Sequence, residues 1–148
     1  MIKIALVGNP NCGKTALFNL LTGSRQKVAN YAGVTVEQKK GFLKTEDGSK
    51  VLILDLPGTY SLRARSPDEA VTRDVVLGRF AEENPPDVFL CVADATNLHL
   101  GLRLVLELKK IGKPIIKLDF QQQAYEADFR FGLMRVREHA ENIAFYNG

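Results

Sequence analysis

The chain has 148 residues, of which 45% are hydrophobic and 25% charged, and its formal net charge is +3. This composition is typical of a soluble globular domain with one core. The small net charge and the scattered basic residues argue against a nucleic-acid partner. No apolar run reaches the ~18 residues that a membrane span needs, and no signal peptide is expected. With Cys12 and Cys91 read as reduced thiols, the expected location is cytoplasmic.

The first predicted element is a buried strand over residues 2–7, and a phosphate-binding loop follows it. Residues 8–15 read GNPNCGKT, which matches the pattern GxxxxGKT. Glycines let such a loop approach an anion, Lys14 can reach the β- and γ-phosphates, and the Thr15 hydroxyl can bind Mg²⁺. A helix over 16–21, closed by Thr22 and Gly23, completes the expected strand–loop–helix unit. The predicted nucleotide-binding residues here are Gly8, Asn9, Pro10, Asn11, Cys12, Gly13, Lys14, Thr15 and Ala16.

A polar stretch over residues 24–36 has no clear period, so we interpret it as a long loop, a kind that is often functional. Thr35 is its best candidate for a hydroxyl ligand to Mg²⁺, although an ordinary β-branched residue opening a strand explains it equally well. Residues 35–44 resemble an edge strand with a charged outer side. The Asp47-Gly48 pair indicates a hairpin turn before a buried strand over 50–55.

The buried strand ends in Asp55-Leu56-Pro57-Gly58, a DxxG sequence. Asp55 can hold Mg²⁺ directly or through water, and the Gly58 N–H can meet a γ-phosphate. Downstream, a capping box that starts at Ser66 predicts a helix to about Glu83. A strand over 88–93, a helix over 98–111 and a strand over 114–118 follow.

Strands that alternate with helices predict an α/β fold with a mostly parallel sheet and right-handed crossovers. In such folds, ligand groups gather beyond the carboxyl ends of the strands. The phosphate loop, Asp55 and Asp94 all follow strand ends. The pattern therefore predicts one nucleotide site.

Three segments, GNPNCGKTALFNLLTG, NYAGVTVE and DLPGTYSL, resemble the G domain of bacterial ferrous iron transport protein B over about residues 1–116. The resemblance implies a Ras-like P-loop GTPase fold that is incomplete at its C-terminal end. It makes Thr35 the switch I threonine and residues 55–58 the switch II motif. Lys14, Thr35 and Gly58 would be the catalytic residues, and Thr15, Thr35 and Asp55 would hold Mg²⁺.

The resemblance also implies a K⁺ site at Asn11, completed by backbone carbonyls near residues 29–31, where K⁺ would replace an arginine finger. The implied function is GTP and GDP binding with slow, Mg²⁺-dependent GTP hydrolysis, because Thr59 stands where Ras has its catalytic glutamine. Full-length relatives continue into a helical bundle and a membrane iron pathway at the cytosolic face of the bacterial inner membrane. This chain would be their cytosolic switch module.

The guanine-reading motif N[KM]xD has no sound copy, because Ile116 stands where asparagine should precede Lys117 and Asp119. The family's spacing leads instead to residues 120–123, FQQQ. We therefore expect a G domain over 1–119, truncated before its base-recognition motifs and impaired in activity. Two other readings remain: a module that binds phosphates but selects bases and hydrolyses poorly, and a P-loop ATPase.

Residues 120–148 predict a helical tail with an apolar stripe. The sequences EADFRFGLMR and REHAENIAFYNG are similar to part of the membrane domain of certain ABC transporters. The chain would then be a chimera. A divergent family member whose last helix packs on the sheet is the alternative.

Overall fold

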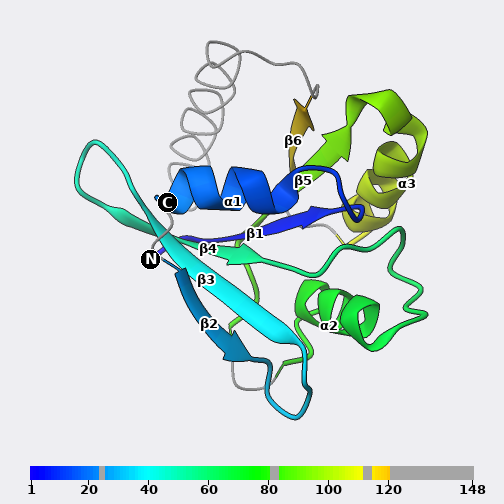
Figure 1. Cartoon of the computed structure of the whole chain (residues 1–148), viewed down its shortest axis with the longest axis horizontal. Coiled ribbons are helices and arrows are strands. Elements are labelled where there is room, and N and C mark those ends of the chain that lie inside the picture. Colours follow the sequence, from blue (N-terminus) through cyan, green and yellow to red (C-terminus); the bar gives the residue numbers. More distant parts are fainter. Residues whose placement is uncertain (24–25, 81–83, 112–114, 121–148) are drawn as a thin grey trace.

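The computed structural model describes residues 1–23, 26–80, 84–111 and 115–120, and the structural statements below refer to these residues. In chain order the elements are β1 (Lys3–Gly8), α1 (Lys14–Thr22), β2 (Gln26–Asn30), β3 (Glu37–Lys44), β4 (Lys50–Asp55), α2 (Pro67–Val76), β5 (Val88–Asp94), a 3-10 turn (Ala95–Asn97), α3 (Leu98–Lys109) and β6 (Ile115–Phe120). The strands form one sheet in the order β2-β3-β4-β1-β5-β6 (Figure 1).

The sheet is mixed, as a Ras-like fold requires. Strands β4, β1, β5 and β6 run parallel to one another, whereas β3 is antiparallel to both of its neighbours, β2 and β4. The hairpin predicted at Asp47-Gly48 joins β3 to β4, and Gly48 takes a φ of 83° that favours glycine. The predicted α/β class is confirmed, with an antiparallel addition at one side.

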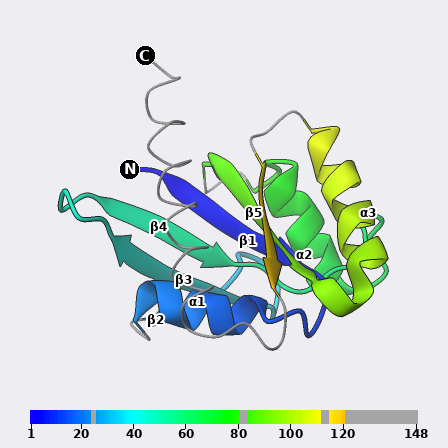
Figure 2. The ribbon, with the colours of Figure 1, turned by 90° about the horizontal axis from the view of Figure 1, so that it is seen from above.

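Successive residues of the central strands point to opposite faces, and each face has its own helices (Figure 2). On one face, Leu17, Phe18 and Leu21 of α1 pack against alternate residues of β1, β4 and β5. On the other face, α2 and α3 cover the intervening residues, among them Ala5, Leu54 and Phe89. The result is a three-layer arrangement that leaves the carboxyl ends of the parallel strands free to build a site.

Helix α2 starts where the sequence predicts and ends earlier. The Ser66 hydroxyl accepts a hydrogen bond from the Glu69 backbone N–H at 3.2 Å, which confirms the N-cap. The helix ends at Val76, however, and not near Glu83. Gly78, at φ 67°, closes it with a Schellman pattern: Gly78 N–H bonds to the Val75 carbonyl at 3.1 Å and Arg79 N–H to the Asp74 carbonyl at 2.8 Å. The sequence signal for this stop was Gly78 itself.

The prediction that residues 24–36 form a loop is wrong for residues 26–30, which are β2. This strand pairs with β3, and it therefore places β3 inside the sheet instead of at the predicted edge. All its residues are exposed, so it has no apolar alternation for a sequence pattern to reveal. Backbone pairing with β3 holds it in place.

The last described strand, β6, runs through residues 119 and 120, two residues beyond the predicted strand. The predicted helical tail lies outside the described residues apart from Phe120. None of the helices in the described ranges has the length and apolarity that crossing a bilayer requires.

Two leucines on α3 offer a test of which helix face belongs to the core. Leu104 is 0% exposed and Leu106 is 61% exposed. We expect Leu104→Ala to lower the free energy of unfolding by about 2–5 kcal/mol, because it leaves a cavity. Leu106→Ala removes the same atoms from a solvated position and should cost no more than about 0.5 kcal/mol. Urea denaturation of both variants measures the difference, and equal losses would contradict this assignment of the core.

Candidate functional site

The loop between β1 and α1 has the backbone that an anion-binding loop needs. Gly13 takes a φ of 88° and Asn11 a φ of 60°. A Cβ on Gly8 would lie 2.6 Å from the Val92 carbonyl oxygen, so close packing requires glycine there. No side chain caps the N-terminus of α1, which leaves its first N–H groups facing the loop.

A pocket of about 460 Å³ lies over this loop. It is lined by Asn9, Pro10, Asn11, Cys12, Gly13, Lys14, Thr15, Ala16, Gly58 and Asp68. The structure thus brings Gly58 and all the predicted loop residues except Gly8 to one cavity. Asp68, in the first turn of α2, was not predicted as a site residue. The capping box placed it in a first turn, but the course of residues 59–65 that carries it to the pocket is not visible in a sequence pattern.

The charged centre of the site joins the phosphate loop to β4. Lys14 Nζ lies 2.6 Å from Asp55 Oδ1, and the two side chains are 9% and 5% exposed. Thr15 Oγ1 donates a hydrogen bond to Asp55 Oδ2 at 3.1 Å. Because β1 and β4 are parallel neighbours with Leu6 opposite Asp55, the acid at the end of β4 reaches the start of α1. Lys14, Thr15 and Asp55 therefore meet as the two motifs predict.

The DxxG segment is fastened to the phosphate loop. A Cβ on Gly58 would lie 2.9 Å from Pro10 Cα, and the Thr59 N–H donates to the Gly8 carbonyl at 3.0 Å. With its amide oriented to satisfy both groups, Asn9 donates to the Thr59 carbonyl at 3.0 Å and accepts from the Gly101 N–H at 3.2 Å. The Asn9 side chain thus ties three segments together, a role its motif position did not reveal.

Thr35 lies apart from this cluster. It is exposed and lines a second cavity, of about 600 Å³, with Asn30, Tyr31, Gly33, Val34, Val36 and Pro67. It is not among the residues that line the phosphate-loop pocket. Of the three residues that the sequence predicts as Mg²⁺ ligands, Thr15 and Asp55 are therefore in contact and Thr35 is not.

Two further residues near the loop serve its local structure. The Asp94 carboxylate accepts hydrogen bonds from the Thr96 N–H at 2.8 Å and its hydroxyl at 2.6 Å, which cap the 3-10 turn and lower the pKa of Asp94. Cys12 is 7% exposed, and burial raises the pKa of its thiol. The Cys12 side chain therefore faces the protein interior as a neutral thiol.

The base-reading side of the site falls mainly outside the described residues. Residues 116–119, the imperfect copy of the guanine motif, are part of β6, and Asp119 is paired in register with Ala93. The alternative position at 120–123 is described only at Phe120, the last residue of that strand.

Comparison with known proteins gives a consistent result. A family model described as ferrous iron transport protein B matches residues 2–139. The Fe(2+) transport protein A/Fe(2+) transporter FeoB fusion protein of Porphyromonas gingivalis is 47% identical over 116 residues, which are 78% of this chain and 13% of that protein.

Solved structures agree in fold. A mutant S. thermophilus NFeoB bound to GDP has a TM-score of 0.69 and 47% identity over 79% of this chain and 43% of that one. The G domain of T. maritima FeoB has a TM-score of 0.71 and 34% identity, and the match covers 100% of this chain and 99% of that one.

The buried pair Lys14–Asp55 can be tested by a double-mutant cycle. Lys14→Ala or Asp55→Ala alone should lower the free energy of unfolding by about 3–5 kcal/mol, because each leaves a buried charge without its partner. The double variant should be more stable than the sum of the single losses predicts. Arg73, whose side chain is 33% exposed and pairs with Asp74, is the control: Arg73→Ala should cost under about 1 kcal/mol. Strict additivity at Lys14 and Asp55 would contradict the coupling.

Proposed function

The chain belongs to the ferrous iron transport protein B family as its N-terminal G domain, and on this premise we propose that it binds GTP and GDP and hydrolyses GTP slowly. The chain spans 13% of the length of the Porphyromonas gingivalis relative, so iron transport itself is assigned to the parts of the full-length protein beyond it. Within a full-length protein of this family, the chain would act as a switch module at the cytosolic face of the bacterial inner membrane. The helical bundle and membrane iron pathway are its partners.

The observation that carries this proposal is the cluster of Lys14, Thr15 and Asp55 beneath the phosphate-loop pocket. In the nucleotide complex, the Lys14 ammonium group exchanges its Asp55 partner for the β- and γ-phosphates. The Thr15 hydroxyl and Asp55 carboxylate, joined at 3.1 Å, are adjacent oxygen donors of the kind that Mg²⁺ takes. Mg²⁺ held there would neutralise charge on the phosphates.

Slow hydrolysis follows from the surroundings of Thr59, the residue after Gly58. Thr59 is 0% exposed, and its hydroxyl donates to the Ser61 carbonyl at 2.6 Å. A hydroxyl that is buried and already donating is poorly placed to orient an attacking water. Positioning of that water then falls to backbone groups and to Thr35.

Thr35 can take part only after the loop that carries it rearranges. It lines the second cavity together with Gly33, which takes a φ of 79°, a backbone conformation that favours glycine. We assign residues 31–36 as switch I, which moves toward the phosphate pocket when a γ-phosphate is bound. The Gly58 N–H contacts the same phosphate and lets switch II follow its loss.

A K⁺ site at Asn11 belongs to the same proposal. Asn11 lines the phosphate-loop pocket and has a left-handed backbone conformation, with a φ of 60°. Its side-chain oxygen and switch I carbonyls near residues 29–31 offer the neutral oxygen ligands that suit an alkali cation. K⁺ there would stabilise negative charge in the transition state as an arginine finger does.

A second candidate function is phosphate binding without base selection. The observation that favours it is the placement of residues 116–119 within β6, where Asp119 pairs with a strand residue and does not stand in a base-reading loop. A site that hydrogen-bonds its substrate rejects the wrong one because buried polar groups are left unpaired. Without such groups the discrimination against adenine disappears.

Titration with fluorescent GDP and ADP separates these functions. A guanine-specific site should bind GDP at least about a thousandfold more tightly than ADP, in line with sites that hydrogen-bond their substrate. Comparable weak binding of both would support the base-unselective candidate, and preference for ADP would indicate an ATPase. Lys14→Ala should weaken every nucleotide that the protein binds. Failure to bind any nucleotide with Mg²⁺ present would contradict the proposed function as a whole.

The K⁺ assignment is tested by turnover in buffers that differ only in cation. GTP hydrolysis should be about a hundredfold faster in K⁺ than in Na⁺, the scale of one transition-state contact. Asn11→Ala should remove this ratio while GDP still binds. Equal rates of the unsubstituted protein in the two buffers would exclude Asn11 from this role.

A further inference from the structure

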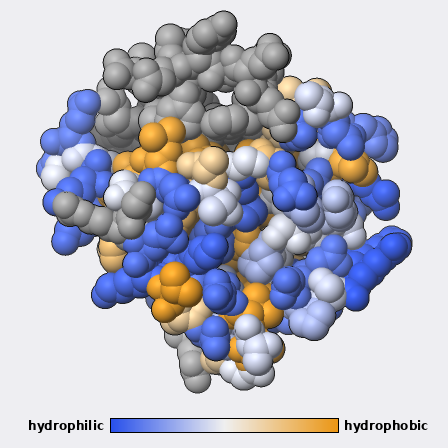
Figure 3. Space-filling model, in the orientation of Figure 1, coloured by the Kyte–Doolittle hydropathy of each residue, from blue (hydrophilic) through white to orange (hydrophobic). Residues whose placement is uncertain are grey.

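Helix α3 (Leu98–Lys109) has an exposed face that the core does not explain. Its inner face, Gly101, Leu104, Val105 and Leu108, is buried against the sheet. Leu98, Leu102 and Leu106 are nevertheless 39%, 40% and 61% exposed. Residues four apart lie above one another on a helix, so these three leucines form one line along its outer surface. Figure 3 shows apolar residues over α3 bordered by hydrophilic ones.

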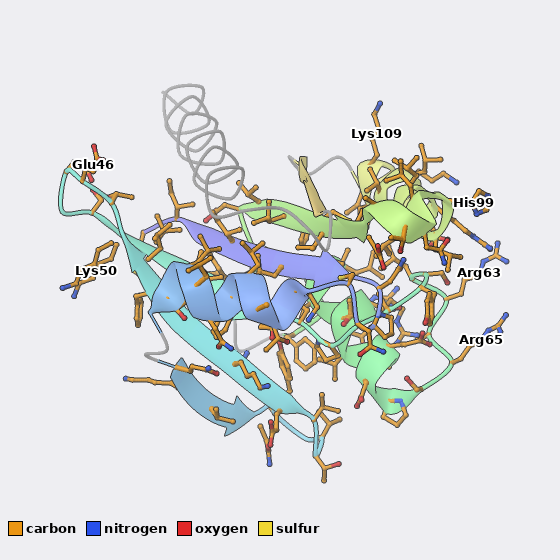
Figure 4. All side chains as sticks on the ribbon, turned by 45° about the horizontal axis from the view of Figure 1, so that its top comes forward. Glu46, Lys50, Arg63, Arg65, His99 and Lys109 are labelled. Atoms are coloured by element: carbon orange, nitrogen blue, oxygen red, sulfur yellow. The ribbon has the colours of Figure 1, made fainter. Side chains whose placement is uncertain are left out.

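The residues around this line are basic. His99, Arg103 and Lys109, with Lys110 at the end of the helix, are all exposed. In the described ranges, none of the four forms an ion pair with another residue. Figure 4 shows His99 and Lys109 pointing outward from the side of the molecule that also carries Arg63 and Arg65.

The acidic residue of α3 does not offset this charge at the outer surface. Glu107 is partly buried, and its Oε2 accepts a hydrogen bond from the Leu62 N–H at 2.7 Å. That bond brings the segment after Gly58 against α3 and places Arg63 next to the helix. The outer face of α3 thus combines leucines and cations with no exposed carboxylate.

We propose that this face, which we call the α3 surface (Leu98, His99, Leu102, Arg103, Leu106, Lys109 and Lys110), docks on an anionic lipid membrane surface. A line of leucines parallel to the helix axis can enter the interfacial region together, while the neighbouring cations meet lipid phosphates. Long basic side chains keep their charge at headgroup level as their stems cover the leucines. This inference concerns a surface outside the nucleotide pocket and is independent of the nucleotide chemistry proposed above.

Charge complementarity favours a lipid surface over a protein groove. The exposed polar side chains of α3 beside the leucine line, His99, Arg103 and Lys109, are basic, whereas the core of a protein interface is depleted of charge. Three half-exposed leucines and a few cations give weak, reversible contact. Such contact suits a cytosolic domain of a membrane transporter, because it favours one orientation of the domain toward the membrane and still allows the domain to detach. Through Glu107 and Leu62, the docked helix is joined to the segment that follows the DxxG motif.

The test is co-sedimentation of the 148-residue chain with lipid vesicles. Binding is expected to vesicles of phosphatidylcholine with phosphatidylglycerol, to weaken with added salt, and to be at least tenfold weaker with phosphatidylcholine alone. Arg103→Ala/Lys110→Ala should lower the partition coefficient about thirtyfold, since each cation near the surface contributes roughly fivefold. Leu102→Ser/Leu106→Ser should lower it too, which charge alone would not predict.

Lys44→Ala/Lys50→Ala is the matched control. It removes the same charge from the β3–β4 hairpin, and Figure 4 shows Lys50 on the side of the molecule away from His99 and Lys109. Its partition coefficient should change less than threefold. Absence of vesicle binding, equal loss in the control, or α3 variants that bind normally would each overturn the proposal. So would a dimer in sedimentation velocity that the α3 variants abolish, because the surface would then join two copies.

Thermal melts and GDP titration accompany each variant. A variant that melts as the unsubstituted protein does and keeps GDP affinity but loses vesicle binding supports the α3 surface. Intact GDP binding without any vesicle binding counts against this inference alone. Vesicle binding without GDP binding counts against the proposed function alone.

Discussion

The contact between Lys14 and Asp55 is the constraint on which the site depends. A lysine and an aspartate buried to this extent stabilise each other only while both remain charged and adjacent. The same two groups are the ones that a polyphosphate and its metal would engage. In the proposed nucleotide complex, Lys14 and Asp55 would exchange each other for these new partners, and the free energy of separating the pair would reduce the affinity for every nucleotide. Thr15, which is hydrogen-bonded to Asp55, would take part in the same exchange.

The parallel sheet makes this contact possible across 41 positions of sequence. Because β1 and β4 are neighbours with the same direction, a loop after one and an acid ending the other arrive at one edge. The Asn9 amide and the Thr59 N–H then hold the DxxG segment, the phosphate loop and the start of α3 together. Hydrogen bonds of 3.0–3.2 Å therefore join these three segments directly.

The sequence predicted the parts of the fold that bury apolar residues with a regular period, together with the two phosphate motifs and their meeting point. It failed for β2, whose exposed residues carry no such period and which is held by backbone pairing with β3. It predicted α2 too long, because Asn84-Pro85-Pro86 is a stronger stop signal in the sequence than Gly78, whose Schellman hydrogen bonds end the helix in the structure. The position of Asp68 at the phosphate-loop pocket and the position of Thr35 at the second cavity depend on the course of two loops. Long-range packing determines that course, and local sequence patterns do not reveal it.

Strand β2 has a consequence for how this protein behaves in concentrated solution. It is one of the two outer strands of the described sheet, it is five residues long, and every side chain is exposed. An outer strand offers unsatisfied backbone groups to any extended chain that meets it, which is a route to aggregation. Here Lys27 stands directly across from Lys40 on β3, so a copy of β2 that paired in parallel and in register would bring a third lysine beside these two. Shortness and like charge together discourage sheet-to-sheet growth at this border.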